Sequence, residues 1–511
     1  MSWTAGYVTD ISYTFGYYSD LNPRRIPLAF LYNGIIPPEI RTACDLGFGQ
    51  GISVNCHCAS QSDAGWWGTD FNPAQAAFAR MLADAAGSGA HLFDQSFAEF
   101  CTRSDLPEFD FIGLHGIWSW ISDENRALIV DFVRRKLKVG GVLYVSYNTL
   151  PGLAPMVPLR HLLTRHTEVM GASGQGTVRK IDASLDFAEK LFALSPQYAR
   201  DNPQIVERLA KFKDQNRHYL AHEYFNRDWH PMPFADMAHR LEQAKLTYAC
   251  SSRYSELIHA MNFTVEQQQF LQEIPDASFR ETVRDYFVNQ QFRRDYWVKG
   301  ALRLSPLERK EALRKQRVIL AVPREGIALK AWGALGESTL QESVYTPLLD
   351  ALADHQPKSL AQLEQTVKEH TISFEQIVEA VMVLVGVDTL MPVQDEKIMA
   401  KSKPRTDKLN AQFMDKSRSS NDISHLASPV AGGGKFVSRF SQLFLLARAN
   451  GKKTPEEWGA FAWKALADQG QRIVINNRIL ETPEENLAEM KSDAEIFADK
   501  HLPVLKALGI A

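Results

Sequence analysis

The sequence predicts an α/β protein whose first domain contains a Rossmann-like parallel sheet. Short apolar runs alternate with helical periodicity through residues 42–148, a glycine-rich turn follows the first run, and an acidic residue closes the second. Such alternation is typical of a parallel sheet with helices on its faces. The chain has 511 residues, which is too long for a single core. We therefore expect roughly three or four domains.

The first strand leads into a loop with glycines at alternate positions. Asp45 closes the strand, and the loop contains Gly47, Gly49 and Gly51. Glycine permits a tight turn and lets the backbone approach a ligand closely. Asp70, at the end of the second strand, is placed to accept hydrogen bonds from ribose hydroxyls, and Asp45 can meet an ammonium group. This arrangement predicts a site for S-adenosylmethionine (AdoMet).

A dinucleotide site is the main alternative for this loop. Its fingerprint is G-x-G-x-x-G with an acid about 20 residues later. Asp70 fits that spacing, but Ile52 stands where the third small residue is required, and Asp45 would repel a pyrophosphate. The pattern favours AdoMet, while a dinucleotide site or a chance glycine-rich turn stays open.

The following segments complete the expected sheet in chain order. Helical periodicity covers residues 73–86 and 123–136, and strand patterns cover 90–94, 109–116 and 140–148. Open α/β folds bind ligands at the carboxyl ends of their strands. Further cofactor contacts are therefore expected from the residues at these ends, which are Phe71, Asn72, Ser96, Phe97, His115 and Gly116.

Composition excludes several classes of function. A net charge of −3 without a long basic run gives no electrostatic footprint for nucleic acid. No signal segment and no apolar span of about 18 residues appear, so we expect a cytoplasmic protein without membrane insertion. Cys56-His57-Cys58 invites a metal interpretation, but a C-x-C pattern lacks a second ligand pair. Buried free thiols and no bound metal are expected instead.

Beyond residue 155 the sequence changes character. Residues 156–218 are helical in pattern, and a cluster of aromatic and titratable residues follows at 219–231. The pattern from 264 to 320 is again helical and rich in charge, so Arg293, Arg294 and Asp295 are expected on a solvated face.

The C-terminal part contains two helical runs and a short strand at 383–391, a shape compatible with a winged-helix-like unit. Residues 396–424 are rich in Lys, Ser and Asp and poor in apolar residues. This composition predicts a linker. Apolar residues return from 426 to 511, so we expect a further packed unit there.

Several motifs resemble those of a known family. They lie at residues 45–51, 114–120, 147–152 and 222–229, with weaker support at 426–429, 469–472 and 502–505. In these motifs the chain is similar to bacterial class I methyltransferases that carry a methyltransferase regulatory domain, including rickettsial protein lysine methyltransferases that modify outer-membrane proteins. The resemblance extends over nearly the whole chain, and the motifs at 147–152 and 222–224 are more specific than the glycine loop.

The resemblance implies a domain order. It places an AdoMet-binding catalytic domain at 1–155 and a helical insertion, often used for dimerisation, at 156–218. A regulatory middle domain over the active site follows at 219–335. A C-terminal domain with a winged-helix-like part occupies 336–511.

The resemblance also implies a protein amine, usually lysine, as methyl acceptor. The expected partners are a protein substrate, such as an outer-membrane or surface protein, and a second copy of the chain in a homodimer. Residues 13–23 are a variant of the family's Tyr- and Pro-rich start. That segment would lie across the methyl donor, so the departure affects the expected substrate more than the fold or the cofactor.

A lysine acceptor must lose a proton before methyl transfer, because its reference pKa is about 10.4. Tyr147 and Asn148, at the end of the fifth strand, are candidates for orienting the amine. His222 or Glu223 could take or relay its proton. Each has a structural alternative: Tyr147 could simply pack, Asn148 could cap a turn, and His222 could be a satisfied buried histidine.

Aromatic rings near the expected methyl donor could face a positive charge. Trp118 follows the fourth strand, and Tyr17 lies in the variant N-terminal segment. An aromatic face attracts cations through its quadrupole, so both residues are candidates for contact with the sulfonium or a methylammonium.

Other acceptors leave different signatures. Methylation of the adenine amino group or of glutamine usually goes with an Asn/Asp-Pro-Pro-Tyr/Phe loop, where this chain has Leu-His-Gly-Ile at 114–117. C5-cytosine chemistry needs a Pro-Cys pair, which is absent from the sequence. An O-methyltransferase acting on a glycan or small molecule would suit a His222 base equally well. A regulatory protein that binds AdoMet without catalysis also stays open.

Overall fold

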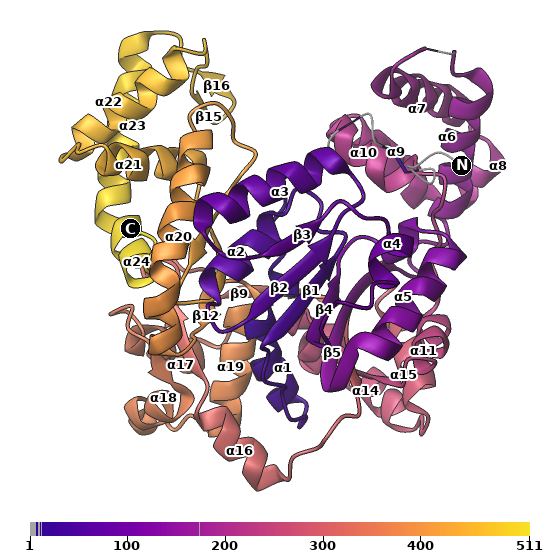
Figure 1. Ribbon diagram of the computed structural model, residues 1–511, viewed down its shortest axis with the longest axis horizontal. Coiled ribbons are helices and arrows are strands. Elements are labelled where there is room, and N and C mark those ends of the chain that lie inside the picture. The colour runs from indigo at the N-terminus through magenta and orange to yellow at the C-terminus, as the bar shows by residue number, and fades with distance from the viewer. Residues whose placement is uncertain (1–6, 9–10, 12, 173) are drawn as a thin grey trace.

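The computed structural model describes residues 7–8, 11, 13–172 and 174–511. A seven-stranded sheet with the order β3-β2-β1-β4-β5-β7-β6 forms its centre (Figure 1). The first five strands are parallel, and β7 runs antiparallel to both β5 and β6. The strands are β1 (Thr42–Leu46), β2 (Gly65–Thr69), β3 (His91–Phe93), β4 (Phe109–Leu114), β5 (Leu137–Asn148), β6 (Leu246–Ser251) and β7 (Phe292–Lys299). The predicted α/β fold with a Rossmann-like sheet is confirmed.

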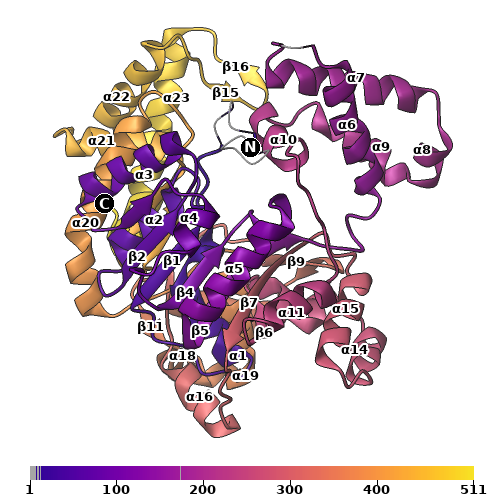
Figure 2. The ribbon, with the colours of Figure 1, turned by 45° about the vertical axis from the view of Figure 1, so that its right-hand side comes forward.

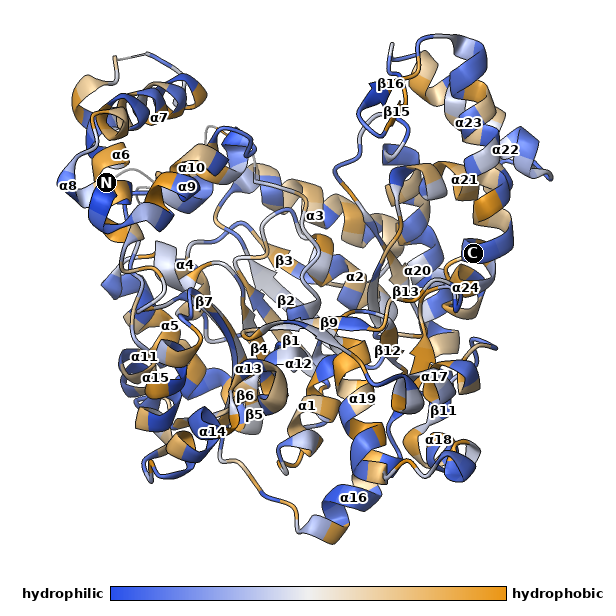
Figure 3. Ribbon diagram, turned by 180° about the vertical axis from the view of Figure 1, so that it is seen from behind, coloured by the Kyte–Doolittle hydropathy of each residue, from blue (hydrophilic) through white to orange (hydrophobic). Residues whose placement is uncertain are grey.

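Helices cover both faces of the sheet, because successive strand residues point to opposite sides. Ala43 and Phe111 pack with α1, α2 and α3, whereas Cys44 and Ile112 pack with α4, α5 and α11. In Figure 3, α1 is mostly hydrophobic, as its buried position requires. These helices are α1 (Ile26–Tyr32), α2 (Ile52–Ser60), α3 (Pro73–Ala86), α4 (Phe97–Cys101), α5 (Asp123–Lys136) and α11 (Phe234–Glu242).

The sheet extends past the domain boundary expected at residue 155. Strands β6 and β7 come from the segment expected to form the middle domain, and β7 replaces part of an expected helix. The solvated face expected for Arg293 and Asp295 is wrong, because these side chains are 5% and 1% exposed. Arg293 pairs with Glu281 and Asp285 of α15 (Ala277–Phe287), which the local sequence pattern does not reveal.

A helical arm projects beyond one end of the sheet (Figures 1 and 2). Its helices are α6 (Met156–Met170), α7 (Thr177–Ala193), α8 (Gln197–Asp201), α9 (Pro203–Phe212) and α10 (Arg217–Tyr224). The arm has a core of its own that includes Leu163, Leu185 and Leu209. The short helices α12 (Tyr254–Leu257), α13 (His259–Asn262) and α14 (Val265–Gln272) lie between β6 and α15.

The next unit contains a three-stranded sheet of order β11-β8-β12, a two-stranded sheet of β9 and β10, and four α-helices. The elements from 306 to 392 are α16 (Pro306–Arg314), β8 (Arg317–Leu320), β9 (Lys330–Gly333), β10 (Gly336–Thr339), α17 (Glu342–Ala351), β11 (Lys358–Ser359), α18 (Leu360–Thr366), α19 (Phe374–Gly386) and β12 (Leu390–Pro392). Residues 383–386 belong to α19, so the strand expected at 383–391 is shorter and later. The winged-helix assignment stays a prediction.

The linker expected near 396–424 is wrong over most of its length. Helix α20 (Glu396–Lys416) occupies it and packs along α2 and α3, burying Thr406, Leu409 and Phe413. The chain ends with β13 (His425–Ser428), β14 (Gly433–Phe436), α21 (Arg439–Ala449), α22 (Pro455–Ala467), β15 (Val474–Ile475), β16 (Arg478–Ile479), α23 (Pro483–Ile496) and α24 (Leu502–Ala507). Within the described part of the chain, no helix combines the length and apolar composition that a membrane crossing requires.

Candidate active site

A cavity of about 270 Å³ opens at the carboxyl ends of β1, β2 and β4, where the sequence predicts the cofactor. Ten of the twelve expected cofactor residues line it: Asp45, Gly47, Gly49, Asp70, Phe71, Asn72, Ser96, Phe97, His115 and Gly116. The other two, Gly51 and Trp118, are not part of the lining. Segments far apart in the sequence therefore meet at one pocket, as the strand order requires.

The glycine loop turns sharply around the pocket. The three glycines have positive φ, with values of 84° for Gly47, 58° for Gly49 and 74° for Gly51. A Cβ on Gly51 would lie 2.4 Å from the Cβ of Ala79 in α3. Gly51 therefore serves the packing of the loop against α3, while Gly47 and Gly49 face the cavity.

Asp70 holds the glycine loop and also faces the pocket. Its Oδ2 accepts a hydrogen bond from the Gly49 N–H at 2.9 Å, and its Oδ1 accepts one from the Asn72 N–H at 2.9 Å. Burial raises the pKa of Asp70 to about 6, although both backbone bonds lower it. Each oxygen retains a lone pair, so the carboxylate can still accept hydroxyl groups.

Asp45 is a buried carboxyl without a complete set of partners. Its side chain is 2% exposed, and its Oδ1 accepts no hydrogen bond from the described residues. Burial, followed by the neighbouring Asp70, raises the pKa of Asp45 to about 7. A buried, unpaired carboxylate is costly unless a cation approaches it. The pocket is therefore suited to a ligand with an ammonium group near Asp45.

Residues 13–18, here called the N-terminal strap, form another wall of the pocket. Tyr13, Thr14, Gly16 and Tyr18 line it. The Tyr18 N–H donates to Ser53 Oγ at 2.8 Å, and Gln50 Nε2 donates to the Tyr13 carbonyl at 3.3 Å. Both partners lie on or next to the glycine loop and α2, so the strap is fixed to the same elements that shape the pocket.

His115 supports the strap from the sheet side. Its ring stacks on Tyr18 with centroids 4.0 Å apart, and its Nδ1 lies 2.7 Å from the Tyr144 hydroxyl on β5. Burial lowers the pKa of His115 to about 4, although Asp20 raises it. The imidazole is therefore neutral and acts as a flat polar wall rather than a cation.

Glu223 does not line the pocket, but its charge reaches residues that do. Burial raises its pKa to about 7, although Arg208 lowers it. Its charge in turn acts on the hydroxyls of Tyr7, Tyr13 and Tyr18, three rings that line the pocket. A carboxylate whose pKa lies near neutral pH, close to aromatic side chains, is suited to receive a cation or a proton.

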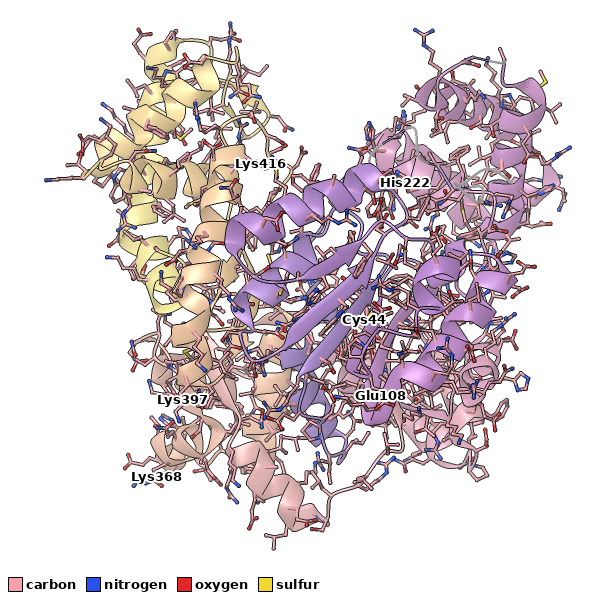
Figure 4. All side chains as sticks on the ribbon, in the orientation of Figure 1. Cys44, Glu108, His222, Lys368, Lys397 and Lys416 are labelled. Atoms are coloured by element: carbon pink, nitrogen blue, oxygen red, sulfur yellow. The ribbon has the colours of Figure 1, made fainter. Side chains whose placement is uncertain are left out.

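His222 lies at the foot of the helical arm (Figure 4). Its Nε2 is 3.1 Å from the Ile11 carbonyl, and its ring contacts those of Tyr7 and Tyr13 at 5.3 and 5.1 Å. His222 does not line the pocket. The structure therefore places it behind two tyrosines that do, as a support for the N-terminal segment.

Other catalytic candidates also lie away from the cavity. The Tyr147 hydroxyl donates to Asp295 Oδ2 at 2.9 Å, because alternation along β5 turns this side chain toward the face of α5 and α11. The expected contact between Tyr147 and an amine is not supported by this placement. Trp118 is fully buried, and its indole N–H donates to Met232 Sδ at 3.4 Å.

Asn148 lies at the end of β5, as expected, and both of its backbone polar groups already make hydrogen bonds within the protein. Its N–H donates to Ser119 Oγ at 2.8 Å, and its carbonyl accepts from the Met232 N–H at 3.1 Å. Its side chain is 7% exposed and does not line the pocket. A direct catalytic contact therefore stays a prediction for this residue.

Tyr17 points to the opposite side of the strap from Gly16 and Tyr18. Its hydroxyl lies 3.1 Å from His57 Nε2 on α2, outside the pocket lining. Contact between Tyr17 and a sulfonium is not supported by this geometry, because an extended chain alternates its side chains.

The structure adds lining residues that sequence analysis did not assign. Among them are Gln50, Gln75, Trp120, Asn125 and Asp228. Gln50 lies between two loop glycines and could have been proposed from that position alone. The others come from separate segments that only the folded chain brings together.

The cysteines are free and buried, which confirms the expected thiols. Among the residues that the structure describes, no three His, Cys, Asp or Glu side chains gather closely enough to hold a metal ion. Cys56 and Cys58 flank His57 on α2 and belong to the packing around that helix.

The buried cluster around Arg293 yields a prediction on stability. Asp285 accepts from Arg293 Nη1 at 2.6 Å, but its Oδ2 has no described partner, and burial raises its pKa to about 7 despite Arg293. An unfolded Asp has a pKa near 3.9. The stabilisation that Asp285 contributes is therefore complete below pH 4 and is lost as the pH rises through 7.

The variant Asp285→Asn is expected to remove this pH dependence. From pH 5 to pH 8, its free energy of unfolding should therefore rise by about 2 kcal/mol relative to that of the wild type. Urea unfolding at both pH values measures it, with exposed Asp214→Asn as control. If the stabilities of wild type and Asp285→Asn change equally with pH, the pKa of the Asp285 carboxyl is not raised in the folded protein.

A family model described as a predicted methyltransferase regulatory domain matches residues 216–299. The protein sll1526 of Synechocystis sp. is 39% identical over 515 residues, with 100% of both chains covered. RP789 of Rickettsia prowazekii is 23% identical over 314 residues, which cover 60% of this chain and 55% of RP789.

Among solved structures, PKMT2 from Rickettsia typhi in complex with AdoHcy superposes with a TM-score of 0.71 at 15% identity. The match covers 97% of this chain and 100% of PKMT2, so the two share a fold over their whole length. Together with the full-length likeness to sll1526, this fold and the regulatory domain define the family. The chain belongs to the class I methyltransferases that carry a methyltransferase regulatory domain.

Proposed function

We propose that this methyltransferase uses AdoMet to N-methylate lysine side chains of a protein substrate. One observation carries the cofactor assignment: the buried, unpaired Asp45 carboxylate faces the same cavity as Asp70. Asp45 would bind the methionyl ammonium and Asp70 the ribose hydroxyls, while Ser96 and Phe97 would hold the adenine. When bound, AdoMet supplies an electrophilic methyl group.

The residues of this chain would orient and deprotonate the acceptor. Tyr7, Tyr13 and Tyr18 offer aromatic faces to an ammonium, and Glu223 offers a carboxylate whose pKa of about 7 suits proton acceptance near neutral pH. An amine gains more than a hydroxyl from such surroundings, because it arrives as a cation. This supports an amine over an O-methyl acceptor.

The relatives give the protein substrate its support. The solved structure that superposes over the whole chain is named PKMT2, and the resemblance of the motifs implies an outer-membrane or surface protein as substrate. Val169, Met170 and Leu194 of the helical arm are 65%, 68% and 81% exposed. Exposed apolar side chains of this kind support a homodimer contact at the arm, which light scattering of the purified chain would test.

The test is transfer of tritiated methyl from AdoMet into a cell lysate that is then separated into protein, nucleic acid, glycan and small molecules. We expect label in protein that survives base treatment, as N-methyl groups do. The variant Asp70→Ala is expected to transfer none, because the ribose contact is lost. Label confined to glycan or small molecules would overturn lysine as acceptor, and no transfer to any fraction would favour a binding protein without catalysis.

A further inference from the structure

The N-terminal strap is held from outside by a hairpin of the C-terminal domain. Gly16 and Tyr18 face the pocket, and Tyr17 between them reaches toward the hairpin β13–β14. The ring of Tyr17 lies 4.9 Å from that of His425 on β13, and its hydroxyl is 3.1 Å from His57 Nε2 on α2. The ring is thus enclosed between α2 and the hairpin.

This contact is neutral. Burial raises the pKa of Tyr17 well above its usual range and lowers that of His57 to about 3 and that of His425 to about 4. The Tyr17 hydroxyl therefore keeps its proton, and its hydrogen bond with His57 joins two uncharged groups. The enclosure depends on shape and a hydrogen bond rather than on an ion pair.

The hairpin leaves room for the Tyr17 ring through two glycines. A Cβ on Gly434 would lie 2.8 Å from Tyr17 Cε2, and one on Gly433 would lie 2.5 Å from the Tyr17 hydroxyl oxygen. Neither glycine has a positive φ, so the backbone at both positions accepts alanine. Their lack of a side chain matters here because of the ring they face.

The same hairpin is fixed to the end of α2. Gln61 Nε2 donates to the Gly432 carbonyl at 2.6 Å, and Gln394 Nε2 donates to the carbonyls of Ser60 at 2.7 Å and Pro429 at 2.5 Å. Helix α2 begins directly after Gly51 of the glycine loop. Two walls of the pocket, the strap and the loop with α2, therefore have one outer support.

We propose that Tyr17 and the hairpin glycines are positioning residues, through which the C-terminal domain sets how tightly the pocket retains AdoMet. Four of the six strap residues line the cavity, so the strap must stay in place for the bound ligand to be enclosed. The inference rests on the proposed binding of AdoMet in this pocket. It gives the C-terminal domain a role in the cofactor site, although the hairpin β13–β14 lies more than 370 residues after the glycine loop in the sequence.

The substitution Gly434→Ala tests the proposal from the C-terminal side. Its methyl group would displace the Tyr17 ring and loosen the strap, so we expect the Kd for AdoMet to rise about tenfold in calorimetry. The control Gly176→Ala, which has open space around it and no positive φ, should bind as wild type does.

A double-mutant cycle with Tyr17→Ala separates this route from general damage. If the effect passes through the ring, Gly434→Ala should add nothing to the Kd once the ring is gone. An additive effect, or unchanged affinity in Gly434→Ala, overturns the proposal. The unfolding temperature of each ligand-free variant shows whether it is folded, and failure of the wild type to bind AdoMet would instead refute the proposed function.

Discussion

Replacing Asp45 with asparagine is expected to weaken AdoMet binding more than about 100-fold and to stabilise the ligand-free protein above pH 7. The two effects share one cause. The cavity holds a carboxyl whose Oδ1 lacks a described partner and whose pKa is raised to about 7 by burial and by Asp70. In the ligand-free protein the buried Asp45 carboxylate lacks a described partner at Oδ1, which is unfavourable, and the ammonium of the ligand would supply that partner.

The sign follows from linkage. The folded pKa of Asp45 lies above the unfolded value near 3.9, so its contribution to stability is complete below pH 4 and is lost as the pH rises through 7. An asparagine does not ionise, so the variant avoids that loss. Titration calorimetry measures the affinity, and thermal unfolding at pH 5.5 and pH 8 measures the stability.

Asp110 offers a control of opposite sign at the other end of the sheet. Its carboxylate accepts from the N–H groups of Arg41 and Thr42 and from Lys138 Nζ, and its pKa is lowered by these bonds despite partial burial. Asp110→Asn should therefore lose stability above pH 4 and leave AdoMet affinity unchanged. If Asp45→Asn binds AdoMet as wild type does, the carboxyl does not meet the ammonium.

The sequence placed most of the cofactor candidates at the cavity because their signals are local. Asp45, the loop glycines and Asp70 lie within one strand–turn–helix unit and the next strand, and their order alone dictates where they meet. Strand ends at Ser96 and His115 could be placed by the same reasoning, since parallel strands expose their carboxyl ends at one edge.

Charged segments were harder to interpret, because their partners are distant in sequence. Strand β7 contains Arg293 and Asp295, which look solvent-exposed until Glu281 and Asp285 of α15 are brought beside them. Helix α20 has the composition of a linker, yet it buries small and polar side chains such as Ser402 and Thr406 against α2 and α3. Composition alone could not show that α2 and α3 provide a surface against which this segment packs.

The acceptor side was predicted only in part. Tyr147 and Tyr17 have the residue type that the chemistry suggests, but the alternation of extended chains turns both away from the cavity. Glu223 keeps its candidacy, because the N-terminal tyrosines that it influences do line the pocket. The face of the sheet to which a side chain points depends on how its strand pairs with the neighbouring strands. The sequence of one segment alone does not reveal that pairing.

Replacing Glu223 with glutamine is expected to lower turnover about 100-fold at pH 7 while leaving the Kd for AdoMet unchanged. The glutamine keeps the size of the side chain but cannot take a proton from an ammonium. Exposed Glu207→Gln on α9 is the matched control and should keep full activity. Initial rates of tritium transfer from AdoMet into lysate protein, at limiting protein, provide the measurement.

The pH profile separates a proton acceptor from a residue that only packs. The wild-type rate at limiting acceptor reports groups of the free enzyme and should rise through pH 7, where Glu223 loses its proton. In Glu223→Gln the rate should instead keep rising toward the pKa of a free lysine, about 10.4. A variant that is slower at every pH with an unshifted profile would show that Glu223 only packs against the tyrosines. A variant with wild-type rates would show that the amine loses its proton directly to water.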